Sequence, residues 1–167
     1  MLKCQGGEGG ESMLLKKKTL EKGVCFFDID GVLNTSGDWS RQYTFRKDLV
    51  ANLCTFARER NLDLVMTSSW RTGFTSFGAE DNLPHIKCLE QEFRGNGVLI
   101  TGKTPVFKGK ARDLEISRYL AYHPYERLIV IDDDRSEYSS VDGLTVLLTD
   151  SAKGFDKETL KKAMKLV

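Results

Sequence analysis

The chain has 167 residues, which is enough for one domain with an adequate core and leaves little room for a second. Its 25 basic and 24 acidic residues give a net charge of +1, so no strong overall field draws the protein to nucleic acid or to membranes. No apolar stretch reaches the length of a membrane span, and residues 1–23 are too polar for a signal peptide. We therefore expect a cytoplasmic protein without a membrane partner, and the sequence indicates no obligate protein partner.

Residues 1–22 contain a glycine-rich stretch followed by three lysines, a composition typical of a flexible leader. We expect a single domain over residues 23–167. The four cysteines are widely spaced and show no metal-ligand pattern, which predicts free thiols in a reducing compartment. His85 and His123 are isolated in the sequence, so we expect structural roles for both.

The apolar run at residues 24–27 is fit for a buried strand and ends in two carboxylates, Asp28 and Asp30. Alternation along a strand places these two side chains on the same side, and Gly31 allows the backbone to turn sharply after them. The pair predicts a site at the end of a strand, although an ordinary acidic exit from a strand is an alternative. An EF-hand calcium loop fits less well, because it needs further oxygen ligands and a glycine at its sixth position.

The spacing of apolar residues predicts a helix within residues 45–61, and a second buried strand follows at residues 62–66. This strand ends in a hydroxyl-rich run, Thr67-Ser68-Ser69-Trp70-Arg71. Hydroxyl groups and unpaired backbone N–H groups at the start of a helix suit phosphate oxygens. Serine and threonine are also favoured helix N-caps, so capping alone is an alternative explanation for this run.

The second half of the chain continues the alternation of helices and apolar strands. We expect helices within residues 83–93, 108–120 and 157–166, and strands at residues 98–101, 128–131 and 144–148. The strand at 128–131 ends in a second acidic cluster, Asp132-Asp133-Asp134. This alternation implies an α/β fold with a doubly wound, Rossmann-like parallel sheet and right-handed crossovers.

Both acidic clusters thus follow strands of one predicted parallel sheet. The carboxyl ends of parallel strands share an edge, and ligands bind at that edge in open α/β folds. Like charges about 4 Å apart repel by about 4 kcal/mol at an effective dielectric constant of about 20, so converging carboxylates need a cation. Oxygen ligands without a nearby histidine or cysteine cluster favour Mg²⁺ over zinc.

The order of these groups resembles the haloacid dehalogenase (HAD) superfamily of Mg²⁺-dependent phosphohydrolases. That order is Asp-x-Asp, a hydroxyl, a lysine and Asp-Asp, and the resemblance covers about residues 23–150. Several runs further resemble the small phosphatase domains associated with Swiss Army Knife RNA repair proteins. These runs are Thr67-Ser68-Ser69-Trp70-Arg71, Arg112 with Glu115-Ile116, Ile131-Asp132-Asp133-Asp134, and Leu148-Thr149-Asp150 followed by Gly154. The chain departs from those domains at Gly154-Phe155, where they commonly carry Gly-Leu.

The resemblance implies that Asp28 is both a metal ligand and the nucleophile, which attacks phosphorus to form an aspartyl-phosphate. It implies that Asp30 protonates the leaving oxygen and then activates water, while its backbone carbonyl reaches the metal. Ser68 would hydrogen-bond the transferred phosphoryl group, with Thr67 and Ser69 as alternatives if the register is one residue off. The latter two are also expected to contact the substrate.

The resemblance further implies a bound Mg²⁺, with Asp133 completing the metal site and Asp132 holding a cation of the protein or a metal-bound water. Lys110 is preferred as that cation. Arg112 and Lys108 remain alternatives, because spacing from the following helix does not decide among the three.

The intervals between the motifs are too short for a folded cap domain, so we expect an open site. An open site admits a phosphate on something large, so nucleic-acid ends or phosphoproteins rank above buried metabolites, and we expect nucleic-acid ends as the phosphorylated substrate. Residues 71–81 are the expected lip, with Arg71 touching the substrate and Phe74 able to stack on a base, whereas Trp70 is expected to pack against the sheet. The alternatives are a small-molecule or nucleotide phosphatase and a non-catalytic phosphate- or metal-binding module.

Overall fold

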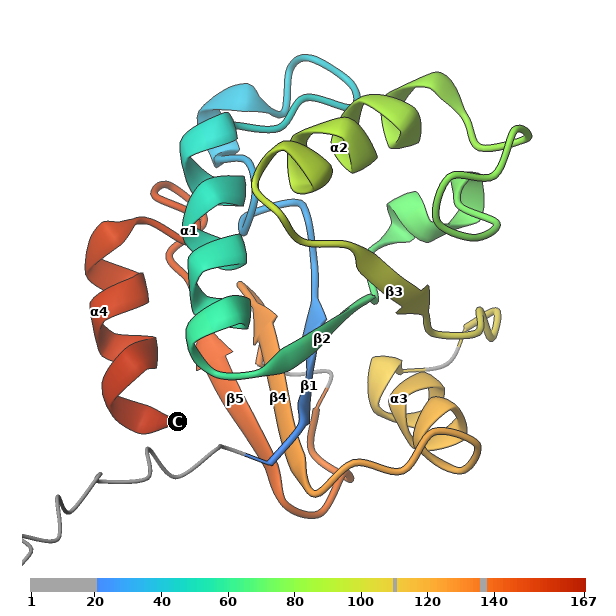
Figure 1. Cartoon of the computed structure of the whole chain (residues 1–167), viewed down its shortest axis with the longest axis vertical. Helices are drawn as coiled ribbons and strands as arrows, with labels where there is room; N and C mark the ends of the chain where they lie inside the picture. Colours follow the sequence, from blue (N-terminus) through green and yellow to red (C-terminus); the bar gives the residue numbers. More distant parts are fainter. Residues whose placement is uncertain (1–20, 110, 136–137) are drawn as a thin grey trace, which may run out of the picture.

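In the computed structural model of the protein, which describes residues 21–109, 111–135 and 138–167, five parallel strands form one sheet (Figure 1). The order across the sheet is β3-β2-β1-β4-β5. The strands are β1 (Gly23–Phe27), β2 (Leu62–Met66), β3 (Ile100–Lys103), β4 (Arg127–Asp132) and β5 (Leu144–Leu148). The predicted doubly wound α/β fold is confirmed.

Helices cover both faces of this sheet (Figure 1). One face carries α1 (Lys47–Glu59), α2 (Pro84–Gly95) and α4 (Lys157–Leu166), and the other carries α3 (Arg112–Leu120). Two short 3-10 helices, η1 (Ser36–Asp38) and η2 (Ser69–Gly73), lie in the loops that follow β1 and β2.

The two-sided core follows from strand alternation in β1. Cys25 and Phe27 point into the cluster beneath α1, α2 and α4, while Val24 and Phe26 point into the cluster beneath α3. All four side chains are fully buried, and burial of a side chain as large as phenylalanine contributes about 1.5–3 kcal/mol. A central strand with apolar side chains on both faces is what a parallel sheet covered by helices requires.

The winding of the chain places a switch point beside β1. From β1 the chain builds β2 and β3 on one side, and it then returns to form β4 on the other side of β1. In open α/β sheets, ligands bind outside the carboxyl ends of the strands at such a reversal. The two predicted acidic motifs follow β1 and β4, the two strands that flank the switch point.

Element bounds differ from the predictions in two places that matter. The strand expected from residue 98 begins instead at Ile100, because the Val98 N–H donates to the Phe93 carbonyl (3.1 Å) and so completes the end of α2. Helix α3 begins only at Arg112, so Lys108 belongs to the preceding turn rather than to the helix. Among the described residues no large cap domain is inserted between the strands, as predicted.

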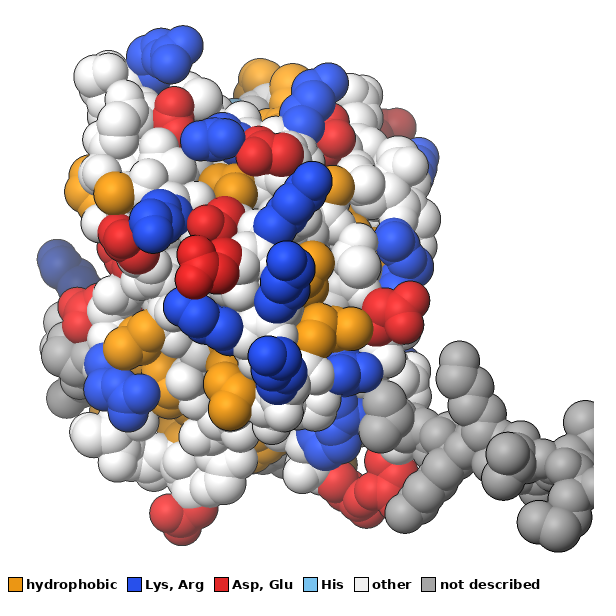
Figure 2. Space-filling model, turned by 90° about the vertical axis from the view of Figure 1, so that its left-hand side faces the viewer, with side chains coloured by type: hydrophobic (Ala, Val, Ile, Leu, Met, Phe, Trp, Pro, Cys, Tyr) orange, Lys and Arg blue, Asp and Glu red, His pale blue; other side chains and the backbone are white. Residues whose placement is uncertain are grey.

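The surface on the side of α4 carries basic side chains interspersed with acidic ones (Figure 2). This mixture agrees with the net charge of +1 and gives the face no field of a single sign. In the part of the chain that the structure describes, no helix has both the length and the apolar character needed to cross a membrane. Cys25, Cys54 and Cys88 are free thiols, whereas Cys4 and most of the predicted leader lie outside the described residues.

Candidate active site

Asp28 stands at the carboxyl end of β1 and extends its ladder. Its backbone N–H donates to the carbonyl of Ile131 (3.0 Å), and its carboxylate Oδ1 accepts from the N–H of Ile29 (2.8 Å). The side chain is buried, with only 5% of the residue exposed. Burial raises the pKa of Asp28, and the nearby guanidinium of Arg112 opposes that rise. The sheet therefore presents this carboxylate in a fixed position and in a largely dry setting.

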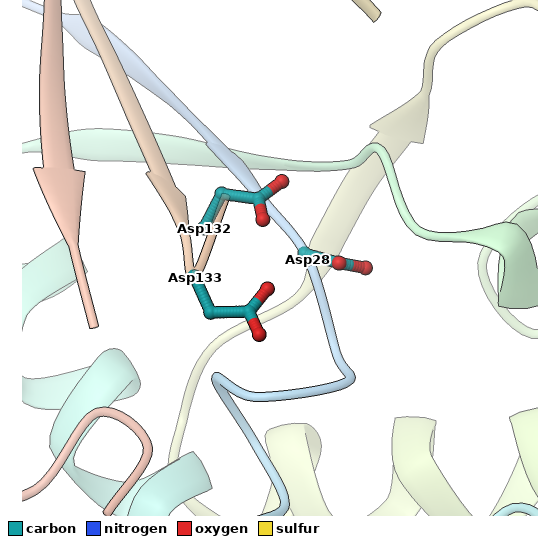
Figure 3. Close-up of side chains that lie close together, drawn as sticks. All are labelled: Asp28, Asp132 and Asp133. Carbon is teal, nitrogen blue, oxygen red and sulfur yellow. The ribbon is translucent and has the colours of Figure 1, made fainter. Parts of the chain in front are cut away.

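Asp28, Asp132 and Asp133 gather at the ends of β1 and β4 (Figure 3). Each can offer one carboxylate oxygen, and the three oxygens lie within 4.8 Å of one another. Two of the residues are buried, so their mutual repulsion is poorly screened by solvent. Oxygen ligands at this spacing fit a hard cation such as Mg²⁺. The predicted convergence of the two acidic motifs is confirmed.

Gly31 makes this convergence sterically possible. Its φ is +74°, and a Cβ atom at this position would lie 2.5 Å from Oδ2 of Asp133. Any other residue would therefore be strained in its backbone and would push against a carboxylate of the cluster. The sequence predicts a turn at Gly31, and the structure adds the close approach to Asp133.

Arg112, the first residue of α3, lies between the two acidic motifs. Its Nη1 is 3.0 Å from Oδ2 of Asp28 and 2.7 Å from Oδ2 of Asp132. Burial lowers the pKa of Arg112, but the interactions with Asp28, Tyr138 and Asp132 together outweigh burial, so the pKa lies above its usual value. Asp132 also accepts a hydrogen bond from the Tyr138 hydroxyl. Lys110, the preferred cation of the sequence analysis, lies outside the described residues.

The hydroxyl run after β2 provides one group that touches the nucleophile candidate. The Ser68 side chain accepts from the N–H of Trp70 (3.3 Å) as the N-cap of η2, and it also hydrogen-bonds Asp28, which lowers the pKa of that carboxyl. Thr67 is fully buried, and its Oγ1 has no hydrogen-bond partner among the described residues. Ser69 is exposed beside Asp30. Capping and a site contact thus coexist at Ser68.

Arg71 corrects the expected lip of the site. Its guanidinium is buried, pairs with Glu115 of α3, and donates to the backbone carbonyls of Thr67 and Ser68. These contacts tie the hydroxyl run to α3 and shield the cation from solvent. Arg71 was expected at the surface of the site and is instead buried. Phe74 is also in the core at 1% exposure, which rules out the stacking expected of it. Trp70 packs in the core, as predicted.

The Asp30 side chain is not one of the three clustered carboxylates and is held by Asn34. The Nδ2 of Asn34 donates to Oδ1 of Asp30 (2.8 Å), and its Oδ1 accepts from Gly31 N–H (2.9 Å) and from Nε1 of Trp39 (3.1 Å). The predicted metal contact of Asp30 runs through its backbone carbonyl and stays a prediction.

A hollow of about 650 Å³ opens beside Asp30. Its lining includes Asp30, Asn34, Trp39, Tyr43 and Ser69. The two aromatic residues, Trp39 and Tyr43, were not predicted from the sequence, because they lie in an irregular segment with no strand or helix period. The available signal was their position a few residues after the Asp-x-Asp motif.

The fold and this arrangement agree with a comparison to known families. A family described as the HAD domain in Swiss Army Knife RNA repair proteins matches residues 24–160. The chain belongs to this family. A search of individual curated proteins finds no match. Membership in the HAD family points to a phosphohydrolase-type function in the setting of RNA repair, and the acidic cluster of this HAD domain could hold the Mg²⁺ that such domains usually use.

Proposed function

We propose that the protein is a Mg²⁺-dependent phosphohydrolase that acts through an aspartyl-phosphate on Asp28, with phosphates at nucleic-acid ends as substrates. The observation that carries the proposal is the setting of Asp28. Its buried carboxylate lies at the switch point of the sheet, in contact with Arg112 and Ser68 and beside the pair Asp132 and Asp133. A nucleophile, a cation, a hydroxyl donor and metal ligands therefore surround one small volume.

The first half-reaction would form a bond between a carboxylate oxygen of Asp28 and phosphorus, and break the bond from phosphorus to the ester oxygen. Asp30 would give its proton to the departing oxygen. In the second half-reaction, the Asp30 carboxylate would take a proton from water as that water attacks phosphorus, which breaks the bond to Asp28 and releases phosphate. Asn34 supports this role, because its amide holds one oxygen of Asp30 in place.

The side chains of Asp28, Asp132 and Asp133, with the Asp30 backbone carbonyl, would hold Mg²⁺. The bound ion would neutralise charge on the phosphoryl group. We assign the positioning cation to Arg112, because it contacts two of these carboxylates. Ser68 would donate to the transferred group, and Arg71 would position the hydroxyl run from behind.

The nucleic-acid substrate is supported by the RNA repair setting of the family, by the lack of a large cap in the described residues, and by the aromatic hollow beside Asp30. A small-molecule phosphatase is the competing function. The two functions are distinguished by comparing the catalytic efficiency on end-phosphorylated oligonucleotides with that on sugar phosphates. A wide margin for the sugar phosphates would replace the nucleic-acid proposal.

The catalytic proposal is tested with an aryl phosphate in Mg²⁺ and in EDTA. Wild-type protein is expected to turn over only with the metal, and Asp28→Asn is expected to remove turnover while the circular dichroism spectrum and melting temperature show an intact fold. Asp142→Asn, which changes an exposed acid before β5, is the matched control and should keep full activity. Full activity of the protein in EDTA, or of Asp28→Asn in Mg²⁺, would refute the proposal.

A further inference from the structure

The hollow beside Asp30 has a built wall. The wall is segment 34–45, whose ends are joined by the Arg46 N–H donating to the Leu33 carbonyl (2.7 Å). Within it, the backbone N–H (3.0 Å) and hydroxyl (2.8 Å) of Thr35 both donate to the Asp38 carboxylate, which fixes η1. The segment therefore leaves the sheet, turns and returns as an anchored loop beside the candidate general acid.

This wall exposes two large aromatic side chains. Trp39 is 49% exposed and Tyr43 is 52% exposed, and both line the hollow. Exposed apolar surface is common on proteins when it is scattered, but here two rings share one concave surface with a carboxylate at its end. The hollow lies within the range of about 300–1,000 Å³ that is usual for small-molecule sites.

Tyr43 is held in an unusual backbone conformation. Its φ is +55°. Among the described residues, Asn61 is the only other non-glycine residue with a positive φ. Asparagine tolerates this region and tyrosine rarely occupies it, so the surroundings must impose the conformation. The ring stacks on His85 (3.8 Å between centroids, 12° between planes) and meets Trp70 edge to face (5.3 Å, 82°). The Tyr43 ring is thus supported by two neighbouring rings, while about half of the residue remains exposed.

A chain of hydrogen bonds links this wall to the chemistry. The Trp39 indole donates to Asn34, and Asn34 donates to Asp30. Because Asn34 is 3% exposed, this connection is shielded from solvent and sets where the indole stands relative to the Asp30 carboxylate. Under the proposed function, Asp30 protonates the oxygen that joins phosphate to the rest of the substrate. The group that occupies the hollow is therefore the one attached to that oxygen.

We infer that the hollow is a nucleobase subsite, in which the base of the nucleotide that carries the scissile phosphate stacks on Tyr43 and Trp39. The inference rests on the proposed function and names the part of the substrate that the site recognises. Rigid aromatic rings bind a flat base through its π-face with little dependence on sequence. An aliphatic phosphate such as a sugar or phosphoserine would bring no flat face to these rings. Arg41 lines the same hollow, with its side chain 72% exposed and 3.7 Å from the Asp38 carboxylate, and we expect it to contact a neighbouring phosphate of a strand.

The test compares two oligonucleotides that end in the same phosphate and sugar and differ only in the base of the last nucleotide, which is present in one and absent in the other. The ratio of their catalytic efficiencies is expected to be on the order of 10-fold in favour of the base for wild-type protein. Trp39→Ala and Tyr43→Gly should each move the ratio toward one. Tyr43→Gly removes the ring at a φ that favours glycine, so the backbone is not strained, and the melting temperature of the variant checks that the loss of the ring leaves the fold intact. Tyr122→Ala, which removes an aromatic ring 65% exposed just after α3, is the matched control and should keep the wild-type ratio.

A second measurement needs no turnover. In EDTA, the base-containing oligonucleotide should quench the fluorescence of Trp39, and the abasic one should quench it less. Trp39→Phe should remove most of the difference, because the remaining tryptophan, Trp70, also lines the hollow but is only 5% exposed. A mononucleotide with the same base separates a free nucleotide from a strand end: Arg41→Ala should weaken only the oligonucleotide and reduce its log–log salt slope by about 0.7.

The outcomes separate the subsite from the reaction. A wild-type ratio near one, or variants that keep the wild-type ratio, would overturn the base subsite and leave the phosphohydrolase proposal standing. A protein inactive on every phosphate ester would remove the proposed reaction, and the quenching experiment would then decide on the subsite alone. Equal quenching by the base-containing and the abasic oligonucleotide would overturn the base subsite.

Discussion

Two groups of side chains flank the end of β1, and they are built in opposite ways. The charge cluster, formed by Asp28, Asp132, Asp133 and Arg112, is largely buried and its members contact one another. The aromatic hollow around Trp39 and Tyr43 is open, and its rings are about half exposed. Transition-state charge is best stabilised by fixed groups shielded from water, whereas a group on a large substrate must be reached from outside. The contrast assigns chemistry to the first region and recognition to the second.

The charge cluster depends on a second layer of buried charge, and the largest effect is expected there. Glu115→Gln leaves the Arg71 guanidinium buried without its ion-pair partner, which should lower the free energy of unfolding by about 3–5 kcal/mol. Urea unfolding measures the change. Glu158→Gln, in an exposed pair with Lys162 on α4, is the control and should cost no more than about 1 kcal/mol. Equal costs for the two variants would show that the buried pair does not support the hydroxyl run.

Next in size is the loss of the cation inside the charge cluster. Arg112→Ala should reduce turnover on the order of 10²-fold, because the charge that offsets Asp28 and stabilises the phosphoryl group is removed. Arg112→Lys keeps the charge but not the planar fork, so a partial recovery is expected. Arg118→Ala, on the same helix with its guanidinium over the Tyr122 ring, should leave turnover unchanged. If Lys110→Ala or Lys108→Ala costs far more than Arg112→Ala, the cation is not Arg112.

The difference between the two regions also explains what the sequence could predict. The apolar runs before Asp28 and Asp132 have the length and composition of buried strands, and parallel pairing then brings their ends together. The convergence, the parallel sheet and the absence of a large cap were therefore predictable. The choice among Lys108, Lys110 and Arg112 was not predictable, because spacing from the following helix does not decide among them; the structure places Arg112 at the cluster, and Lys110 lies outside the described residues.

The aromatic hollow was not predictable by these means. Trp39 and Tyr43 lie in a segment fixed by backbone hydrogen bonds and by an unusual φ, neither of which leaves a period in the sequence. Arg71 was misplaced for a related reason. Its partner Glu115 is distant in sequence, and a buried ion pair between two elements cannot be read from either one alone.

A smaller effect tests the metal within the charge cluster. Asp133→Asn should raise the Mg²⁺ concentration for half-maximal activity by at least about 10-fold, because one of the three converging carboxylates loses its charge. The increase in melting temperature produced by Mg²⁺ should fall in parallel, which gives a readout independent of turnover. Asp142→Asn again serves as the control. If the Mg²⁺ concentration for half-maximal activity is unchanged, the metal ligand is Asp132 or Asp134 rather than Asp133.

The smallest effect is expected outside both regions, at the start of α4. A change there should alter stability alone and leave turnover unchanged. Asp156 caps α4 by accepting from the Thr159 N–H (2.8 Å), and this bond holds the pKa of Asp156 below its ordinary value of 3.8. Because the pKa is lowered in the folded state, the ionised cap contributes its full stabilisation at pH values above 3.8, the ordinary pKa. This stabilisation is lost as the pH falls through the pKa of the folded state. Asp156→Ala should therefore cost about 1 kcal/mol at neutral pH, and less in acid, as measured by urea unfolding. Asp156→Asn keeps the acceptor without the charge, so its cost relative to the wild type should be smaller at neutral pH and should also shrink as the pH falls and the wild-type carboxylate loses its charge. A cost for the alanine variant that is the same in acid would show that the charge of the cap contributes nothing, and a change in its turnover would show that α4 is coupled to the site.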